Sequence, residues 1–395
     1  MQVKPEIERF AKIRVVGVGG AGGNVINSMI ESNQIRGVEF ISINTDAQDL
    51  SINKAVIKIP IGQELTQGLG AGSNPEIGRK AAEESLDLIK SNLEGANMVF
   101  ITAGLGGGTG TGASPTVARI AKESGALTIG VVTKPFNFEG IQRMRAADRG
   151  MMELRKEVDA LITIPNQKLL EVADEDMSII EAFRLSDSVL NQGVQGISDL
   201  IVMPGLINVD FADVKTIMKD AGTALMGIGI GTGENRAEVA AKAAISSPLL
   251  EQSVEGAKGI LFNISGGPDL TMREVDRAAN IIRGIAGEEA DIIFGTSIDD
   301  ELAGQLKITV IATGFEVPEE DDSMAGYVEK HYGQPLRKDK TEVPFQQNIP
   351  QTPQAETPPE DKKQPKLPSE MWKPDDAEDE DYGTGFDIPT FLRQK

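Results

Sequence analysis

The sequence predicts an α/β protein with a doubly wound parallel sheet, a long central helix, a second and smaller α/β domain, and a disordered C-terminal tail. Three observations support this fold class. Short β-branched runs alternate with helical stretches over the first 175 residues, which is typical of a parallel sheet covered on both faces. Residues 177–203 carry apolar residues at helical spacing, and the composition changes sharply after residue 317.

The first part of the chain is expected to alternate strand and helix. The expected strands are residues 12–18, 38–44, 97–103, 126–133 and 160–165, and the expected helices are residues 24–32, 75–93, 114–124 and 138–158. In such a fold the carboxyl ends of the strands share one edge of the sheet, which is where ligands bind.

The central helix is predicted from eight apolar positions: Ile179, Ile180, Phe183, Val189, Leu190, Val194, Ile197 and Ile201. It should end at Pro204 and Gly205. A smaller mixed unit follows, with helices at 211–220, 236–245 and 271–285 and strands at 223–231, 258–265, 290–298 and 306–315. The predicted divisions are residues 1–175, the helix 176–204, residues 205–317, a linker 318–385 and a terminal peptide 386–395.

Charge and composition exclude several functions. The 395 residues include 60 Asp and Glu against 39 Lys and Arg, a net charge of -21, which argues against binding to nucleic acid or to an anionic membrane surface. There is no Cys, so disulfides, thiolate nucleophiles and Cys-ligated metals are excluded. No apolar run reaches the length of a signal peptide or of a membrane span, so we expect a cytoplasmic protein without direct membrane insertion.

The segment from Pro318 to Lys395 has the composition of a disordered tail, because it holds 11 of the 20 prolines and 4 of the 43 glycines and carries a charge of -8. The only His, the only Trp and all three Tyr also lie there: His331, Trp372, Tyr327, Tyr332 and Tyr382. The remainder therefore has no imidazole or thiol for a catalytic triad or a transition-metal site. Its chemistry must use carboxylates, cations, hydroxyls, amides, backbone groups or a hard metal ion.

Three glycine-rich loops each run into an expected helix. The first, with Gly17, Gly19 and Gly22, fits the dinucleotide pattern G-x-G-x-x-G, and a tight structural turn explains it equally well. The second, residues 104–112, has six glycines in nine positions, which favours backbone contact with a ligand over turn geometry. The third, residues 68–72, precedes Asn74 and Pro75, which are placed as N-cap and first helical residue. The loops should converge on one crevice that could hold a polyphosphate.

The motif GGGTGTG in the second loop is typical of the tubulin/FtsZ family of GTPases, and the chain resembles that family from about Lys12 to Phe315 and again at its end. Further motifs agree in order: GGAGGN, NTDAQDL, GLGAGSNPEIG, TKPFNFEG, IPNQKL, NVDFADV and DIPTFLRQ. The resemblance implies a GTPase of bacterial cell division. One departure is Ala21, where many members have glycine, and it affects only the expected affinity.

The resemblance implies a set of GTP- and GDP-binding residues. The phosphates would be held by Gly20, Ala21, Gly22, Gly23 and Asn24, by Gly106, Gly107, Gly108, Thr109, Gly110 and Thr111, and by Gly70, Ala71 and Gly72. Asn44 and Asp46 would support the γ-phosphate and its Mg²⁺, which would be held mainly by the phosphates. Thr133, Glu139 and Arg143 would lie near the ribose and α-phosphate, and Asn166, Phe183 and Asp187 would contact the base. From spacing alone Phe183 could be core, Glu139 and Arg143 a solvated helix pair, and Asp187 a surface acid.

The resemblance also implies that catalysis needs a second subunit. Asn208, Asp210 and Asp213 would reach the nucleotide of the adjacent subunit and polarise the attacking water, so that head-to-tail assembly forms a filament and completes the site. From the sequence alone, Asp210 is better explained as a helix cap.

The end of the tail resembles a partner-binding peptide of this family. Apolar residues return there after an acidic run, and the peptide would bind membrane-tethering and regulatory division proteins such as FtsA through Asp387, Ile388, Pro389, Phe391 and Leu392. Two other functions stay open at this point. One is an NAD-dependent oxidoreductase that uses the first loop and Asp46, and the other is a nucleotide-binding scaffold without catalysis.

Overall fold

The computed structural model describes residues 11–33, 35–171, 176–203, 207, 209–247, 254–287 and 290–315, all within one compact unit, residues 1–335. The central feature is a ten-stranded sheet in the order β3-β2-β1-β4-β5-β6-β7-β10-β8-β9. Its strands are β1 (Ile13–Val18), β2 (Val38–Asn44), β3 (Ile57–Pro60), β4 (Met98–Gly104), β5 (Leu127–Lys134), β6 (Ala160–Pro165), β7 (Gly222–Thr232), β8 (Gly259–Gly266), β9 (Asp291–Ile298) and β10 (Gln305–Thr313).

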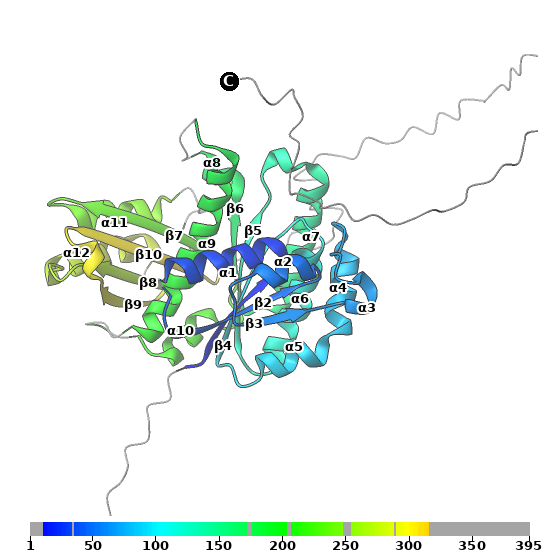
Figure 1. Cartoon of the computed structure of the whole chain (residues 1–395). Helices are drawn as coiled ribbons and strands as arrows, with labels where there is room; N and C mark the ends of the chain where they lie inside the picture. The colour runs from blue at the N-terminus through cyan, green and yellow to red at the C-terminus, as the bar shows by residue number, and fades with distance from the viewer. Residues whose placement is uncertain are drawn as a thin grey trace, which may run out of the picture. The chain divides into compact units, whose positions relative to one another are not determined.

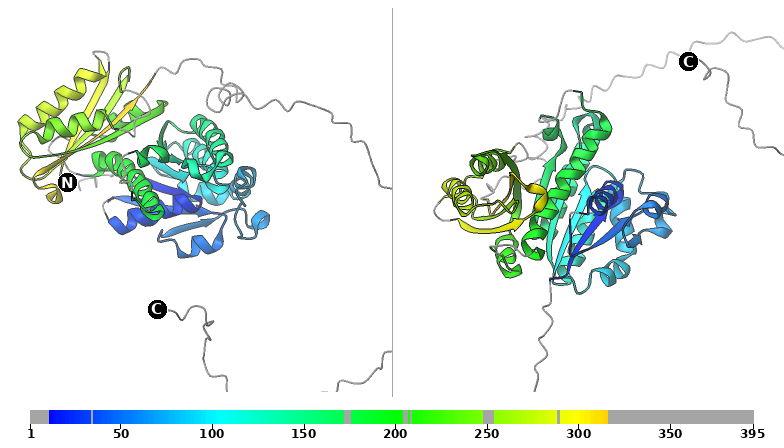
Figure 2. Two further views of the ribbon diagram at one scale, coloured as in Figure 1. Left: turned by 90° about the horizontal axis from the view of Figure 1, so that it is seen from above. Right: turned by 60° about the vertical axis from the view of Figure 1, so that its left-hand side comes forward.

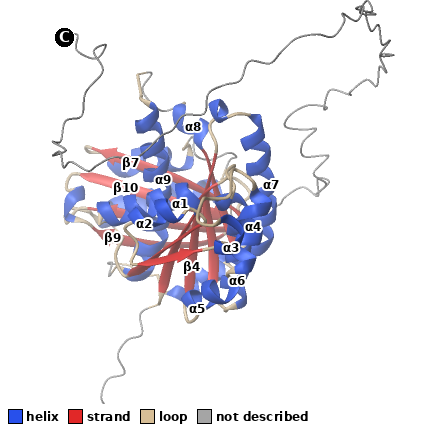
Figure 3. Cartoon of the chain, turned by 45° about the vertical axis from the view of Figure 1, so that its right-hand side comes forward, coloured by secondary structure: helices blue, strands red, loops and turns tan. Residues whose placement is uncertain are grey.

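The helices lie on both faces of these strands (Figure 3). They are α1 (Gly19–Ser32), α2 (Ala47–Ile52), α3 (Gln63–Thr66), α4 (Pro75–Glu84), α5 (Leu86–Leu93), α6 (Thr109–Glu123), α7 (Ile141–Glu157), α8 (Asn166–Leu170), α9 (Ile179–Val202), α10 (Phe211–Met218), α11 (Arg236–Ile245) and α12 (Met272–Ala286), with short 3-10 turns η1 (Asn137–Glu139) and η2 (Asp300–Leu302). None of the helices in this described part is both long and apolar enough to cross a membrane.

Strands β1 to β6 pair in parallel, and alternate residues along them face opposite layers. Ile13 and Val15 of β1 join a core with α1 and α9, whereas Val16 and Val18 join a second core with α4, α5, α6 and α7. This two-sided burial explains why the strands are apolar almost throughout. The predicted doubly wound fold is confirmed.

The second half has a mixed sheet, in which β10 lies antiparallel between β7 and β8, and β9 is parallel to β8. Helices α11 and α12 cover it with a third core. The sequence suggested two domains joined by a long central helix. Strand β7 also pairs in parallel with β6, so one sheet runs through both halves. The predicted domain limits stay predictions.

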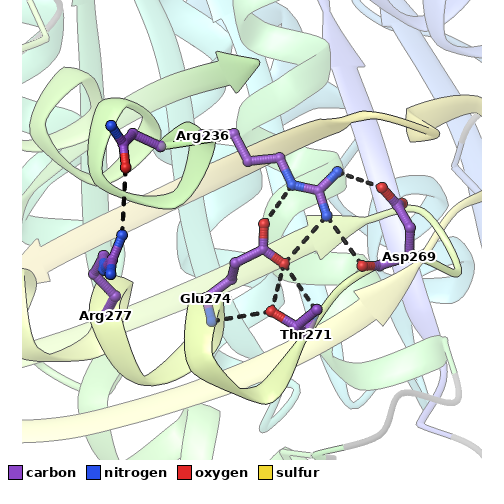
Figure 4. A network of polar contacts seen from close by, with 6 residues as sticks. Arg236, Asp269, Thr271, Glu274 and Arg277 are labelled. Carbon is purple, nitrogen blue, oxygen red and sulfur yellow. Dashed lines mark hydrogen bonds and ion pairs between the residues drawn. The ribbon is translucent and has the colours of Figure 1, made fainter. Parts of the chain in front are cut away.

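A buried arginine fixes the second half at one end. Arg236, at the start of α11, donates to the Glu274 carboxylate at 2.6 Å and to Asp269 Oδ2 at 2.6 Å, and Thr271 closes a capping box with Glu274 (Figure 4). The guanidinium pairing lowers the pKa of Glu274 to about 2. The network therefore ties α11 to the loop that leads into α12.

Helix α9 lies between the two halves (Figures 1 and 2). Its first turns meet residues that follow β5 and β6, because Phe183 contacts Phe136 and the Ser186 hydroxyl donates to Asn166 Oδ1. Its last residue, Val202, packs against Gly37, which precedes β2. The helix therefore runs from the carboxyl edge of the sheet to its amino edge, over about 36 Å for 24 residues.

Several expected elements differ in their limits. The expected helix 75–93 is two helices that meet at Ser85, whose hydroxyl accepts from the Gly62 amide and so joins the break to the loop before α3. The helices expected at 24–32 and 114–124 begin earlier, at Gly19 and Thr109, because the glycine loops themselves form the first helical turns. Four short elements, α2, β3, α3 and α8, were not predicted.

Candidate nucleotide site

The three glycine loops meet at the carboxyl edge of the sheet, as predicted. A side chain on Gly19 would lie 2.8 Å from the Gly110 amide nitrogen, and one on Gly108 would lie 2.8 Å from Ala71 Cβ. The hydroxyls of Thr45 and Thr109 are 2.6 Å apart. These contacts join the first loop to the second and the second to the third.

Two helices begin where these loops meet, and no described residue caps either of them with its side chain. These are α1, which starts at Gly19, and α6, which starts at Thr109, and neither has an acidic residue in its first turn. By contrast α4, which begins next to them, is capped by Asn74. Uncapped first-turn amides and the positive ends of two helix dipoles favour an anion such as a phosphate group.

The six glycines of the second loop have two different explanations. For Gly104, Gly106, Gly108, Gly110 and Gly112, a Cβ would lie within 3.0 Å of another part of the protein, so packing of the loops requires glycine there. The argument from ligand contact is therefore unnecessary for these five. Gly107 is different, because no protein atom beyond its neighbours in the chain lies within 4 Å of its Cβ position. Its open side is available to a ligand.

The other predicted phosphate residues belong to the same three loops. In α1, Gly20, Ala21 and Asn24 are exposed and Gly22 and Gly23 are buried. Ala21 has no positive φ, so alanine is not strained at this position.

The loop hydroxyls and the third loop also have contacts within the protein. Thr111 Oγ1 accepts from the Gly106 amide at 2.8 Å, and Thr109 bonds to Thr45, so both hydroxyls already order the loops. In the third loop Gly70 and Gly72 have positive φ and flank the buried Ala71.

An acidic group borders the first loop. Asp46 caps α2 through its Oδ1 atom, and Asn44 donates to Asp49 Oδ2 at 2.7 Å. Burial, together with the charge of Asp46, raises the pKa of Asp49, while the bond from Asn44 opposes this shift. Asp49 was not among the predicted site residues, although it stands within the quoted motif NTDAQDL.

The predicted base-binding residues come together at the start of α9. Phe183 is 41% exposed and is not core, and its ring meets Phe136 at 5.4 Å and Phe138 at 6.4 Å, both edge to face. Phe138 is 59% exposed, so the cluster offers aromatic surface to a ligand, and Phe136 and Phe138 are residues that spacing did not single out.

Asp187 and Asn166 adjoin this aromatic cluster. Burial raises the pKa of Asp187 to about 6, with no neighbouring charge or donor in the described part of the chain to offset it. Asn166 is buried and accepts from Ser186. A half-buried carboxylate without a partner, beside exposed aromatic rings, is suited to a flat ligand with N–H donors.

Thr133, Glu139 and Arg143 lie between the base end and the loops. Thr133 is buried at the end of β5, and its carbonyl accepts from the Leu105 amide. Arg143 pairs with Glu139 at 2.7 Å, which is the helix pair expected from their spacing. Glu139 also accepts from the Phe136 amide, so the pair orders the segment that carries the aromatic rings.

The predicted catalytic acids lie elsewhere. Asp210 caps α10, since its Oδ1 accepts from the Asp213 amide at 2.8 Å. In return, Asp213 Oδ2 accepts a weak hydrogen bond from the Asp210 amide at 3.4 Å. The other end of α10 lies at the amino edge of the sheet, where Thr313 donates to the Ile217 carbonyl and Gly222 to that of Asp159. Asn208 and the peptide residues Asp387, Ile388, Pro389, Phe391 and Leu392 lie outside the described residues.

Comparison with known proteins agrees with this geometry. Residues 12–174 match the model of the Tubulin/FtsZ family GTPase domain, and residues 222–316 match that of the FtsZ family C-terminal domain. The chain is 46% identical to FtsZ from M. jannaschii in a structure described as an empty dimer, with a TM-score of 0.75 over 78% of this chain and 89% of that one.

Two more distant structures share the fold. CetZ1 from Haloferax volcanii, a GDP-bound monomer, is 22% identical, with a TM-score of 0.67 over 79% of this chain and 96% of that one. CetZ2 from the same organism, a GTPγS-bound protofilament, is 24% identical, with a TM-score of 0.65 over 78% of this chain and 94% of that one.

The fold and the site thus define a guanine-nucleotide-binding domain of the tubulin/FtsZ GTPase class. The matches give no support to the alternative of an NAD-dependent oxidoreductase. Both family models and the 46% identity place the chain more narrowly, and it belongs to the FtsZ family.

Proposed function

We propose that this chain hydrolyses GTP to GDP and phosphate only after it has assembled head to tail into a filament, and that the filament forms the ring of cell division in the cytoplasm. The observation that carries the proposal is the separation of the two halves of the active site. The nucleotide loops lie at the carboxyl edge of the sheet and the acidic pair follows α9, which ends at the amino edge.

The strand lengths set how far the end of α9, which the acidic pair follows, lies from the nucleotide loops. The parallel strands β1, β2, β4, β5 and β6 have six to eight residues, which sets the edges about 20–25 Å apart. Asp210 and Asp213 would have to lie within about 3 Å of the attacking water to polarise it. A second copy stacked in the same orientation would bring its amino edge, and with it the segment after α9 that carries these acids, toward the carboxyl edge of the first.

The nucleotide end supports binding more than chemistry. In the four segments 19–24, 44–49, 68–74 and 104–111 there is no Lys, Arg or His. Two helix ends and backbone amides would hold the phosphates, Asp187 would accept from the guanine N1–H and amine, and Phe183 would contact the base. No group here has the position and basicity of a general base, so an isolated subunit should turn over slowly.

The same lack of cations supports a requirement for Mg²⁺. Asn44, Asp46 and Asp49 supply carboxylate and amide oxygens beside the first loop, which are ligands that Mg²⁺ accepts directly or through water. Bound there with the nucleotide, the ion would neutralise phosphate charge.

Self-association and tethering complete the proposal. The dimeric state of the FtsZ structure from M. jannaschii supports contacts between copies of this chain. The terminal peptide 386–395 would join the filament to membrane-tethering division proteins such as FtsA, beneath the inner membrane.

The test uses Asp213→Ala in the full-length protein. The variant retains the 2.8 Å cap made by Asp210 and loses only the 3.4 Å bond, so it should fold and bind GTP normally. We expect phosphate release to fall by at least about 100-fold, the cost of removing a group that acts in the transition state, and the variant to lower the rate of wild type when mixed with it. Asp87→Ala, at another exposed first-turn aspartate, is the matched control.

Protein concentration separates the proposal from its alternatives. Wild-type turnover per subunit should rise above a threshold concentration at which light scattering also rises with GTP and Mg²⁺. A constant turnover on dilution, or full activity of Asp213→Ala, contradicts the shared site. Filaments that never release phosphate would instead establish a scaffold without catalysis.

A further inference from the structure

A carboxylate faces the helix end that is proposed to bind phosphate. Asp49 Oδ2 lies 3.5 Å from the position of a Cβ on Gly20 and 4.0 Å from that on Gly23, both in the first turns of α1. Asn53, the residue that follows the end of α2, donates to the Gly23 carbonyl at 2.9 Å. Asp49 and Asn53 therefore both approach the first turns of α1.

Asp49 cannot easily turn away from this position. Asn44 donates to its Oδ2 atom at 2.7 Å, and its own amide donates to Asp46 Oδ1 at 3.1 Å. The side-chain oxygen of Asn44 accepts from the Asp46 amide at 3.3 Å. Both polar atoms of Asn44 therefore serve the two aspartates, and the charge of Asp49 is held beside the first loop.

This charge opposes the proposed ligand. A phosphate group on the first turn of α1 would meet the Asp49 carboxylate, and the loop segments contain no Lys or Arg to offset it. At about 6 Å and an effective dielectric constant of about 20–80, one such pair of charges weakens binding roughly 3- to 100-fold. A divalent cation between the carboxylate and the phosphates would turn the repulsion into attraction.

We propose that Asp49 is a positioning residue that makes nucleotide binding depend on a divalent cation, an inference that rests on the proposed function. It disfavours the nucleotide alone and favours the nucleotide with its cation, either by direct contact or through a water on the ion. The role is additional to that of Asp46, whose Oδ1 atom caps α2.

The test measures GDP affinity of the full-length protein by fluorescence with a labelled GDP, once in EDTA and once across a Mg²⁺ series. The variant is Asp49→Asn, which keeps an oxygen to accept from Asn44. We expect it to bind GDP about tenfold more tightly than wild type in EDTA, and the ratio of affinities with and without Mg²⁺ to fall about tenfold or more. Asp87→Asn, an exposed aspartate of α5, should leave the ratio unchanged.

The proposal is overturned if Asp49→Asn leaves the ratio of GDP affinities with and without Mg²⁺ unchanged. This includes the case in which the variant weakens binding equally in both conditions, which is the result expected of a merely structural role. If Asp49→Asn fails to fold, Asp49→Ser removes the same charge and is judged by the same ratio. Failure of the proposed function is distinguishable, since the wild type would then bind no guanine nucleotide at any Mg²⁺ concentration.

Discussion

Asp187→Asn should stabilise the nucleotide-free protein while impairing its binding of GTP. Burial raises the pKa of Asp187 from 3.8 to about 6, so the folded state disfavours its charged form. At about 1.4 kcal/mol for each pH unit between the two pKa values, the charged carboxylate costs the folded state roughly 3 kcal/mol at pH 7.5. Asparagine has the same shape and no charge, so the variant should recover most of that free energy.

The effect of Asp187 on stability changes with pH in a definite direction. Because the folded pKa is above the unfolded one, the native state binds the extra proton, and stability is lost as pH rises from about 4 to about 6. The advantage of Asp187→Asn should therefore be about 3 kcal/mol at pH 7.5 and roughly half of that at pH 5.0. Urea unfolding without nucleotide measures both values.

Binding should change in the opposite direction. The carboxylate would accept two N–H bonds from guanine, and loss of such a charged acceptor should weaken GTP binding about 30- to 100-fold. Asp276→Asn, at an exposed site in the middle of α12, is the control and should change stability by less than about 0.5 kcal/mol. If Asp187→Asn is less stable than wild type at pH 7.5, or its advantage is independent of pH, the carboxylate has a partner and the reasoning is refuted.

Three further variants test the loop packing and the Arg236 network. Gly107→Ala should leave thermal unfolding unchanged and weaken nucleotide binding about tenfold. Gly112→Ala, whose Cβ would overlap the Pro75 carbonyl oxygen, should lose about 2 kcal/mol or more of stability. Equal melting temperatures for the two variants would contradict this. Arg236→Met should cost about 3 kcal/mol at pH 7, and the difference from wild type should shrink as pH falls from about 4.5 to 2, because the depressed pKa of Glu274 stabilises only its charged form. Urea unfolding at pH 7 and pH 3.5 checks it, and a constant difference would count against it.

The sequence predicted the fold class and the meeting of three glycine loops because both follow from local patterns. Alternating β-branched runs and helices specify a parallel sheet, and in a parallel sheet the loops after the strands share an edge. The pattern could not show that β7 pairs with β6. Three residue pairs join these strands, and their register is set by tertiary contacts. The pattern also placed the starts of α1 and α6 too late, because glycine is a poor helix former. Most of the glycines in these first turns are required by the close packing of the loops.

The residues of the candidate site divide in the same way. Asp210 as a cap and Glu139 with Arg143 as a helix pair follow from spacing, and both are observed. Asp49 was missed because an aspartate on a short helix has no periodic signal, and its importance arises only from its distance to Gly20. Phe138 was missed because an exposed aromatic residue in a 3-10 turn is visible only beside Phe183.

The site is assembled from groups that disfavour the empty protein. Asp187 is charged without a partner, Asp49 faces a helix end beside Asp46, and the first amides of α1 and α6 have no cap. Each would be satisfied by a different part of one ligand, namely the N–H edge of the base, the cation and the phosphates. Because the ligand removes penalties that the unfolded chain does not have, binding should stabilise the fold by an amount that grows with the logarithm of the ligand concentration above its Kd. A nucleotide-free subunit should therefore be the least stable species, and loss of GDP should be slow compared with loss of a ligand that satisfies only one of these groups.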